Sequence, residues 1–387
     1  MNASRRIFCL LALVALAAFA FSTQACEFCN GEREKPLVSQ FEDAELVLVG
    51  HFKNAKQSAD GIAPGNTDFM IQQVYKGDPM MKGKTLSLPR YVPDSKTKFI
   101  IFGETYKGKI DAYKGTPLVN DSEMLKYIDG MVKVKAKTQG ERLRYAFDYL
   151  NSPESDVSTD AYREFGRSDY ADYKEMAKTL PADKLANWLK DPKTPPYRLS
   201  LYASLLGHCG NAEHAKQLRA MMDEMFADKT KGSGMHGLLA GYIMLEPEKG
   251  WTYVKDLVKD EDKYFLARFT GLQTIRFLYE SRPDLRNKDV VIARNEIIQG
   301  TLGAMTVKDI ADFAVEDLRK WKRWECCDRV LGMFGQKGFN TNTIRKSILR
   351  YALQCPKEEA RDFVKVQRVL NKDWVDDTKE LLELETR

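Results

Sequence analysis

The chain has 387 residues, of which 43% are hydrophobic, 11% aromatic and 30% charged, and its formal net charge is +5. This composition excludes a disordered or collagen-like chain, and the mean hydropathy of −0.44 excludes a protein that crosses a membrane many times. At about 100–200 residues per domain, the length predicts about two domains, each large enough to bury a core.

Residues 1–25 have the pattern of a secretory signal peptide. A basic pair at residues 5–6 precedes an uninterrupted apolar run over residues 7–21, and small residues follow up to Ala25. As a helix the run would span about 22 Å, less than the roughly 30 Å of a bilayer's hydrocarbon core. We therefore expect cleavage between Ala25 and Cys26, export to the periplasm or the extracellular space, and no transmembrane segment in the mature chain. A lipoprotein anchored at Cys26 is the alternative.

The charge and motif content of the mature chain argue against several functions. Cleavage would remove two basic residues and no acidic ones, so the net charge would fall from +5 to +3. No Lys/Arg tract stands out, and the sequence therefore does not predict binding to nucleic acid. No Gly-x-Ser-x-Gly, His-Glu-x-x-His or EF-hand motif occurs, and we expect no catalytic residues, metal or cofactor.

Residues 26–130 have the sequence pattern of a small β domain. The region contains short apolar or alternating runs separated by turn residues, at 45–51, 67–75, 85–88, 98–102 and 110–113. The second run loses its alternation at Gln72 and Gln73, which predicts a β-bulge. A short helix is expected at residues 37–41. Five short strands predict a small Greek-key barrel such as an OB-fold.

Helical spacing replaces the strand pattern after a linker at residues 131–140. Within residues 141–387, apolar side chains recur on one helical face, as in Trp251, Val254 and Val258, and Pro and Gly residues separate the segments. Three of the apolar helices open with an arginine: Arg198, Arg268 and Arg345. The expected fold class is therefore α+β and multidomain, with an all-α helical array of HEAT-like solenoid type in the second half. A globular bundle is the alternative.

Six cysteines remain after cleavage, namely Cys26, Cys29, Cys209, Cys326, Cys327 and Cys355. An even number in an exported chain is compatible with disulfides, and all six are candidates, with fifteen possible full pairings. Cys26 and Cys29 bond to each other, reach into the second half or remain free. We favour a disulfide that tethers the mature N-terminus, and a redox-active Cys-x-x-Cys pair is the alternative.

Trp321 and Trp324 enclose two cationic residues in the second half. Two tryptophans at this spacing are a candidate binding surface for a sugar or a peptide, since their rings can stack on a ligand. Anchoring of the helical core is the alternative role.

Parts of residues 26–115 resemble the bacterial netrin-like, or tissue-inhibitor-of-metalloproteinase-like, OB domain. The resemblance rests on Cys26-Glu27-Phe28-Cys29 and on the runs at residues 40–50, 69–77 and 98–103. The second half is similar to HEAT-like repeat domains of exported bacterial proteins. Inhibitors of the netrin-like family chelate a protease zinc through an N-terminal cysteine, a position that Cys26 would occupy. This chain differs from them in having Cys-x-x-Cys where they carry Cys-x-Cys.

Together these patterns predict an exported, non-enzymatic protein-binding or scaffolding protein. The solenoid would offer an extended surface to a protein partner of unknown identity. The alternatives are a thiol-disulfide oxidoreductase that uses Cys26 and Cys29, and a metalloprotease inhibitor that acts through Cys26.

Overall fold

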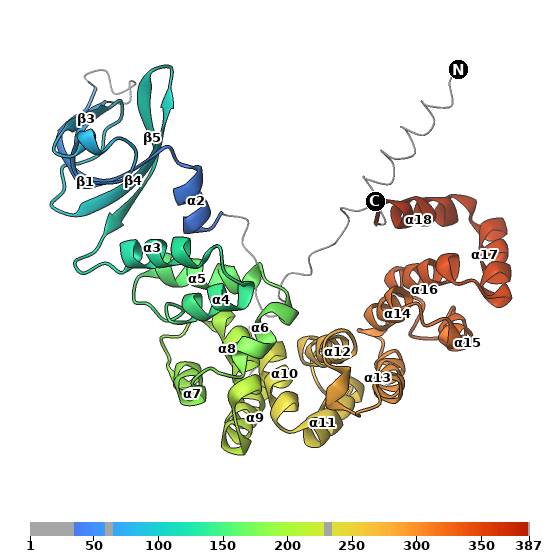
Figure 1. The fold of residues 1–387 in the computed structure, drawn as a ribbon. Helices are drawn as coiled ribbons and strands as arrows, with labels where there is room; N and C mark the ends of the chain where they lie inside the picture. The colour runs from blue at the N-terminus through green and yellow to red at the C-terminus, as the bar shows by residue number, and fades with distance from the viewer. Residues whose placement is uncertain (1–34, 59–64, 228–233, 386–387) are drawn as a thin grey trace, which may run out of the picture. The chain divides into compact units, whose positions relative to one another are not determined.

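The computed structural model describes residues 35–58, 65–227 and 234–385. The chain divides into two compact units, residues 1–176 and 177–387, which we call the N-terminal and the C-terminal unit (Figure 1). Each is described by itself. Residues 1–34, which include the predicted signal peptide and its cleavage site, lie outside the described residues.

The N-terminal unit contains the predicted helix and the five predicted strands. A short helix, α2 (Leu37–Asp43), precedes an antiparallel sheet whose strand order is β3-β2-β1-β4-β5. The strands are β1 (Leu46–Lys56), β2 (Asn66–Lys76), β3 (Thr85–Leu88), β4 (Lys98–Tyr106) and β5 (Lys109–Leu118). Most of them are longer than predicted because they continue into polar, exposed residues, whose sequence carries no apolar signal.

The predicted β-bulge is present in β2. Val49 pairs with Gln73 and the next residue, Gly50, pairs with Ile71, so Gln72 is the extra residue in the ladder. Gly50 also lies where β1 and β2 come closest, because a Cβ there would lie 2.0 Å from the carbonyl oxygen of Met70. The loss of alternation at Gln72 and Gln73 was therefore a correct signal of the local backbone.

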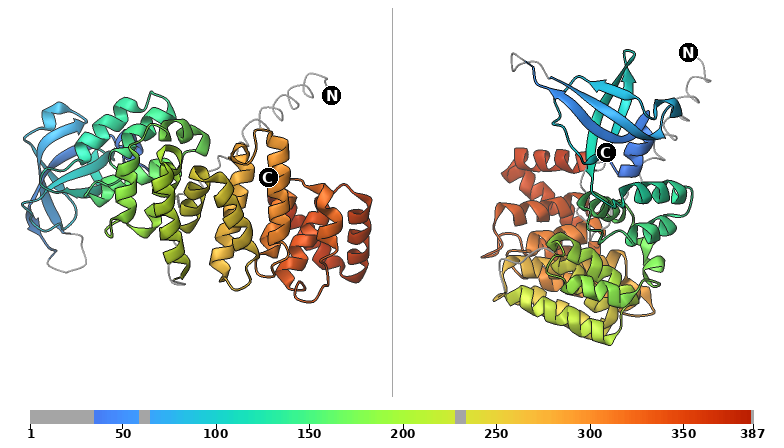
Figure 2. Two further views of the ribbon diagram at one scale, coloured as in Figure 1. Left: turned by 90° about the horizontal axis from the view of Figure 1, so that it is seen from below. Right: turned by 90° about the vertical axis from the view of Figure 1, so that its left-hand side faces the viewer.

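One apolar core joins all five strands. It comprises side chains from the central and the edge strands alike, namely Leu46, Leu48, Phe52, Phe69, Ile71, Leu88, Ile101 and Ala112. An ion pair of 3.1 Å between Arg90, just after β3, and Asp111 on β5 joins the two edges of the sheet. The sheet is strongly twisted (Figure 2) and, in the described part of the chain, has no ladder between β3 and β5. It is thus an open sheet that curls around its core.

Four helices follow the sheet in or at the end of the N-terminal unit: α3 (Met124–Val134), α4 (Gln139–Phe147), α5 (Ser155–Gly166) and α6 (Tyr170–Ala177). Residues 131–140, the predicted linker, hold the end of α3 and the start of α4, which Thr138 and Glu141 cap reciprocally. The predicted domain limits, 26–130 and 141–387, stay a prediction.

Asp160 on α5 ties the helices before and after the sheet together. Its Oδ1 accepts a hydrogen bond from the backbone N–H of Leu37 at 2.7 Å, and its Oδ2 accepts one from the hydroxyl of Tyr127 at 2.9 Å. Burial raises the pKa of this carboxyl, while the two hydrogen bonds act in the opposite direction. The buried carboxylate therefore fixes the start of α2 against α5.

The C-terminal unit is an array of helices, as predicted. Its elements are α7 (Ala182–Lys190), α8 (Leu199–Cys209), α9 (Ala212–Ala227), α10 (Met235–Leu245), α11 (Pro247–Lys259), α12 (Phe265–Glu280), α13 (Val290–Ala304), α14 (Ala311–Lys320), α15 (Cys327–Leu331), α16 (Asn342–Gln354), α17 (Glu358–Leu370) and α18 (Lys372–Glu385). The predicted apolar face of α11 is buried at Trp251, Val254 and Val258. The α+β class is thus confirmed, with an open sheet followed by helices.

Close packing of α8 against α10 depends on glycine. A Cβ at Gly237 on α10 would lie 2.1 Å from the carbonyl oxygen of Ser200 on α8. Any other residue would force the two helices apart, so this spacing requires a glycine.

Candidate functional site

The cysteine pair on which the thiol and inhibitor alternatives depend, Cys26 and Cys29, lies outside the described residues, as does Ala25. The predicted signal cleavage and the N-terminal disulfide therefore stay predictions.

The four remaining disulfide candidates are free thiols in this structure. Cys326, Cys327 and Cys355 are buried in the C-terminal unit and Cys209 is half-buried. Burial raises the pKa of Cys327 to about 12, with a hydrogen bond to Cys355 adding to the rise, and it raises the pKa of Cys209 to about 11. Thiols that hold their protons this tightly supply almost no thiolate at neutral pH.

Trp321 and Trp324 are half-buried and each contacts a tyrosine of the same unit. Trp321 stacks on Tyr279 with ring centroids 3.9 Å apart, and its Nε1 donates a hydrogen bond to Glu280 at 2.8 Å. Trp324 meets the ring of Tyr351 edge-on at 5.1 Å. Both rings therefore pack within the array, and their proposed role as a ligand surface stays a prediction.

Arg268, one of the three arginines found at the start of an apolar helix, has a structural role in the first turn of α12. Arg268 is buried, and its Nη1 donates hydrogen bonds to the carbonyl oxygens of Asp260 and Glu261, both at 3.0 Å, and to that of Lys263. Its Nε donates to Oδ1 of Asp309 at 3.2 Å, and a second nitrogen bonds the other oxygen of that carboxylate. One side chain thus fastens the loop before α12 to the loop before α14.

Further arginine–carboxylate contacts hold α12, α14, α16 and α18 side by side (Figure 1). Arg276 on α12 donates to Asp317 on α14 at 2.8 Å. Arg350 on α16 donates to Glu316 on α14 at 2.6 Å and also pairs with Glu385 on α18. These four helices form one row of the array.

Three phenylalanines gather on this row, where α12 meets α14. The ring centroids of Phe265 and Phe269 on α12 are 5.5 Å apart, and that of Phe313 on α14 is 4.8 Å from Phe269 and 6.2 Å from Phe265. Phe265 is 43% exposed and the other two rings are half-buried. We call this group the phenylalanine cluster. It presents an aromatic surface to solvent on two adjacent helices, which makes it a candidate contact site.

Acidic residues border the phenylalanine cluster. Asp312 precedes Phe313 on α14, and residues 260–262, all acidic, precede α12. Burial raises the pKa of Asp312, and the neighbouring carboxylates Glu316 and Asp309 raise it further. Of these neighbours, Asp309 pairs with Arg268 and Glu316 pairs with Arg350.

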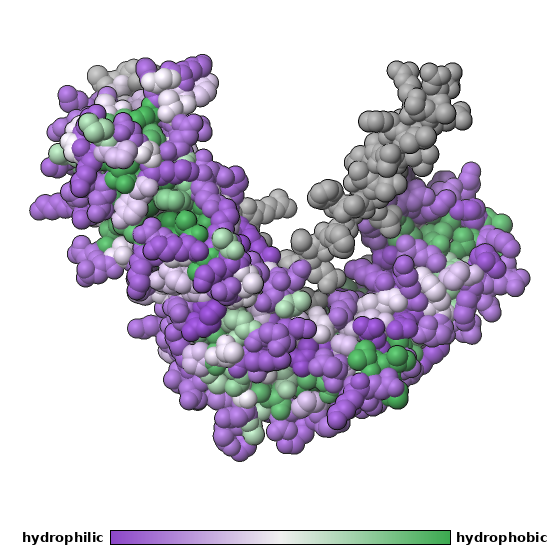
Figure 3. Space-filling view, viewed as in Figure 1, coloured by the Kyte–Doolittle hydropathy of each residue, from purple (hydrophilic) through white to green (hydrophobic). Residues whose placement is uncertain are grey.

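Two other apolar patches of the C-terminal unit each lie on a single helix. Val291 at the start of α13 is 69% exposed and Val369 on α17 is 87% exposed. Figure 3 shows a surface that is mostly hydrophilic, with smaller hydrophobic areas among the hydrophilic ones. α17 also carries Phe363, whose ring centroid lies 4.9 Å from that of Phe334.

In the described part of the chain, no three His, Cys, Asp or Glu side chains are placed to hold a metal ion. None of the described helices combines the length and the apolar character needed to cross a membrane. No family model, curated protein or solved structure matches the chain. The resemblances to netrin-like and HEAT-like domains are therefore proposals.

Sequence reasoning missed the phenylalanine cluster and the arginine contacts along the row. The sequence spacing of the residues that form these contacts could have predicted them. Three of the contacts between α12 and the α14 region join residues 41 positions apart: Arg268 with Asp309, Arg276 with Asp317, and Glu280 with Trp321. A search for a period near that length would have aligned the two helices.

Proposed function

We propose that this protein is an exported, non-enzymatic binding protein whose helical array holds a protein partner. The observation that carries the proposal is the phenylalanine cluster. Its rings form an apolar surface on two neighbouring helices, and such surfaces are typical of protein contact sites. The acidic border at Asp312 and residues 260–262 favours a partner segment that places an apolar side chain between the rings and basic residues beside it.

The proposed architecture joins a HEAT-like solenoid to an OB-like barrel. The 41-residue spacing of contacts between α12 and α14 supports the solenoid, since HEAT-type repeats have about 40–47 residues. A core shared by both edge strands and the ion pair of Arg90 with Asp111 support a partly open five-stranded barrel. A solenoid supplies the extended surface that a protein partner requires.

Export is tested by the mass of the chain recovered from cells. We expect intact-mass measurement to show a mature chain that begins at Cys26 and carries no acyl group, because the apolar run at residues 7–21 fits a cleaved signal peptide. A diacylglyceryl adduct on Cys26 would establish the lipoprotein alternative, and an uncleaved chain would contradict the signal-peptide interpretation.

Partner binding is tested with a photoreactive phenylalanine analogue at position 265 of the full chain, produced in its own host. We expect a crosslink to one protein from position 265 and none from position 291, a matched exposed apolar site on α13. The captured protein is then purified and titrated against wild type and Phe265→Ala. We expect the substitution to weaken binding by about tenfold or more, as for a hot-spot aromatic residue.

The control for this titration is Val291→Ala, which removes an exposed apolar side chain away from the cluster. We expect its affinity to stay within about twofold of wild type, since it lies outside the proposed contact. Equal crosslinking from both positions, or unchanged affinity of Phe265→Ala, would show that the cluster is not the contact site.

A further inference from the structure

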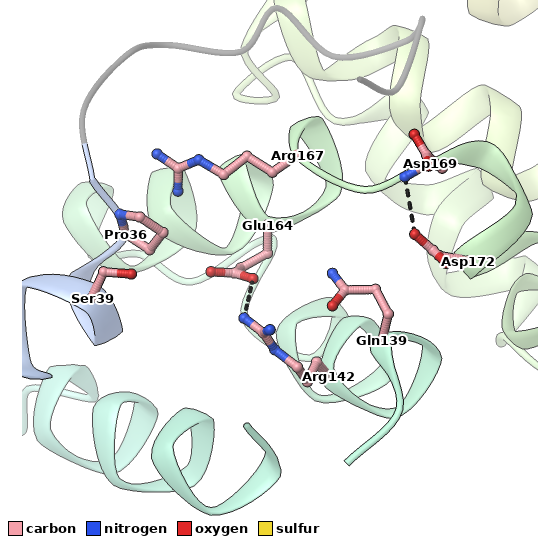
Figure 4. A pocket seen from close by; sticks show the side chains of 8 residues that line it. All are labelled: Pro36, Ser39, Gln139, Arg142, Glu164, Arg167, Asp169 and Asp172. Carbon is pink, nitrogen blue, oxygen red and sulfur yellow. Dashed lines mark hydrogen bonds and ion pairs between the residues drawn. The ribbon is translucent and has the colours of Figure 1, made fainter. Parts of the chain in front are cut away.

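A polar pocket of about 450 Å³ lies within the N-terminal unit. Side chains from α2, α4, α5 and the start of α6 line it, among them Ser39, Arg142, Glu164, Arg167 and Asp169 (Figure 4). Its volume is within the range of pockets that hold small molecules. The hydrogen bond from the backbone of Leu37 to Asp160, one turn before Glu164 on α5, positions α2 at its edge.

Glu164 is the central group of this pocket. Its side chain is 3% exposed, and Oε2 accepts a hydrogen bond of 3.0 Å from Nη2 of Arg142. The other oxygen, Oε1, is buried and has no hydrogen-bond partner in the described chain. Figure 4 shows this oxygen pointing away from Arg142, toward Ser39 across the pocket. Buried carboxylate oxygens are nearly always hydrogen-bonded, so this one calls for a donor.

Two more buried atoms at the pocket lack a partner in the described chain. They are Oδ1 of Asp169 and Nε of Arg142. Figure 4 shows Asp169 on the opposite side of the pocket from Ser39, so the acceptor that faces Ser39 is the free oxygen of Glu164. Arg167 adds a second positive charge to the lining. Burial raises the pKa of Glu164 by more than the Arg142 guanidinium lowers it, so one ion pair does not offset the desolvation of this carboxyl.

We propose that the pocket binds a small zwitterion of the α-amino-acid type, with its ammonium on Glu164 and its carboxylate on Arg167, whose side chains Figure 4 shows on the same side of the pocket as Ser39. An ammonium carries three donors and no acceptor, which matches the unpartnered oxygen of Glu164. A carboxylate is the preferred partner of guanidinium groups. This ligand site is separate from the proposed protein contact and does not depend on it.

Simpler ions fit the pocket less well. An anion alone would approach the Arg167 guanidinium but would face the free oxygen of Glu164, which repels it. A metal cation would face Arg142 and Arg167, and no three potential ligands in the described residues are placed to hold one. Only a ligand with both charges satisfies both sets of groups.

The experiment is a calorimetric titration of the full chain with each of the twenty L-amino acids. Two half-probes accompany them: ethanolamine, which lacks the carboxylate, and propionate, which lacks the amine. We expect at least one amino acid to bind at one site per chain and both half-probes to bind at least tenfold more weakly. Binding of no amino acid would overturn the proposal, and equal binding of ethanolamine would assign the pocket to simple amines instead.

Two variants locate the site. Glu164→Gln keeps an acceptor for Arg142 but places an amide donor where the ammonium would bind, so we expect at least tenfold weaker binding. Asp148→Asn removes an exposed carboxylate that pairs with Arg144 outside the pocket, and we expect its affinity to stay within twofold of wild type. If Glu164→Gln does not fold, Arg167→Gln takes its place, because it removes the charge that would bind the ligand's carboxylate. Unchanged affinity in the pocket variant that folds would overturn the proposal.

Discussion

Replacement of Arg268 by methionine is expected to lower the free energy of unfolding of the C-terminal unit by about 3–5 kcal/mol. Methionine fills much of the volume of the arginine stem, but it leaves the carbonyl oxygens of the loop before α12 without their donor. It also leaves the Asp309 carboxylate, 35% exposed, without its partner. The loss is large because one buried guanidinium binds two loops of the array.

The measurement is urea unfolding followed by tryptophan fluorescence. All five tryptophans lie between residues 188 and 374, so the signal reports the C-terminal unit alone. The matched control is Arg368→Met, which removes an exposed ion pair of 3.1 Å with Asp376, and we expect it to cost less than about 1 kcal/mol. Similar losses in the two variants would show that the contacts of Arg268 add nothing beyond an ordinary surface pair.

The β half was predictable because its signals are local. A strand that buries one face alternates every two residues, and a bulge breaks that alternation where it occurs, as at Gln72. The helix at Leu37 and the apolar face of α11 follow from similarly short patterns. Closure of the sheet depends instead on the approach of β3 to β5, which no local pattern encodes.

The candidate sites were not predictable in the same way. Phe269 on α12 and Phe313 on α14 are separated in the sequence by α13, and Phe313 alone resembles any other apolar position of an amphipathic helix. The burial of Glu164 could not be predicted either, because charged residues are usually exposed and no pattern in the neighbouring sequence indicates that this one is buried. Its partner Arg142 lies 22 residues away on another helix. Both sites exist only once the helices have packed.

The pairing of the cysteines could not be predicted for a related reason. Their even number suggested disulfides, but a bond needs two Cβ atoms within about 4.5 Å, and the spacing in sequence does not determine that distance. Cys209, for instance, lies at the end of α8, where its thiol donates to the carbonyl of Leu205 at 3.5 Å.

Asp317 is expected to make the stability of the C-terminal unit fall as pH rises from about 4 to about 7. Its side chain is 1% exposed on α14, and burial raises its pKa to about 6 even though Arg276 acts to lower it. The unfolded carboxyl has a pKa near 3.9. Because the folded state binds the proton more tightly, the stabilising contribution is complete below the unfolded pKa and is lost as pH rises through the folded pKa. A difference of about two units corresponds to about 2–3 kcal/mol.

Asp317→Asn isolates this contribution, because asparagine keeps an acceptor for Arg276 and does not titrate. Other titrating groups are common to both chains, so the test is the difference in unfolding free energy between variant and wild type, measured by tryptophan fluorescence at several pH values. We expect that difference to shift by about 2–3 kcal/mol in favour of asparagine between pH 4 and pH 7. For the exposed Asp376→Asn, we expect the corresponding difference to stay flat, since Asp376 is 48% exposed and solvated in both states. Parallel profiles of wild type and Asp317→Asn would mean that the buried carboxyl titrates as it does in the unfolded chain, and that its pairing with Arg276 fully offsets its burial.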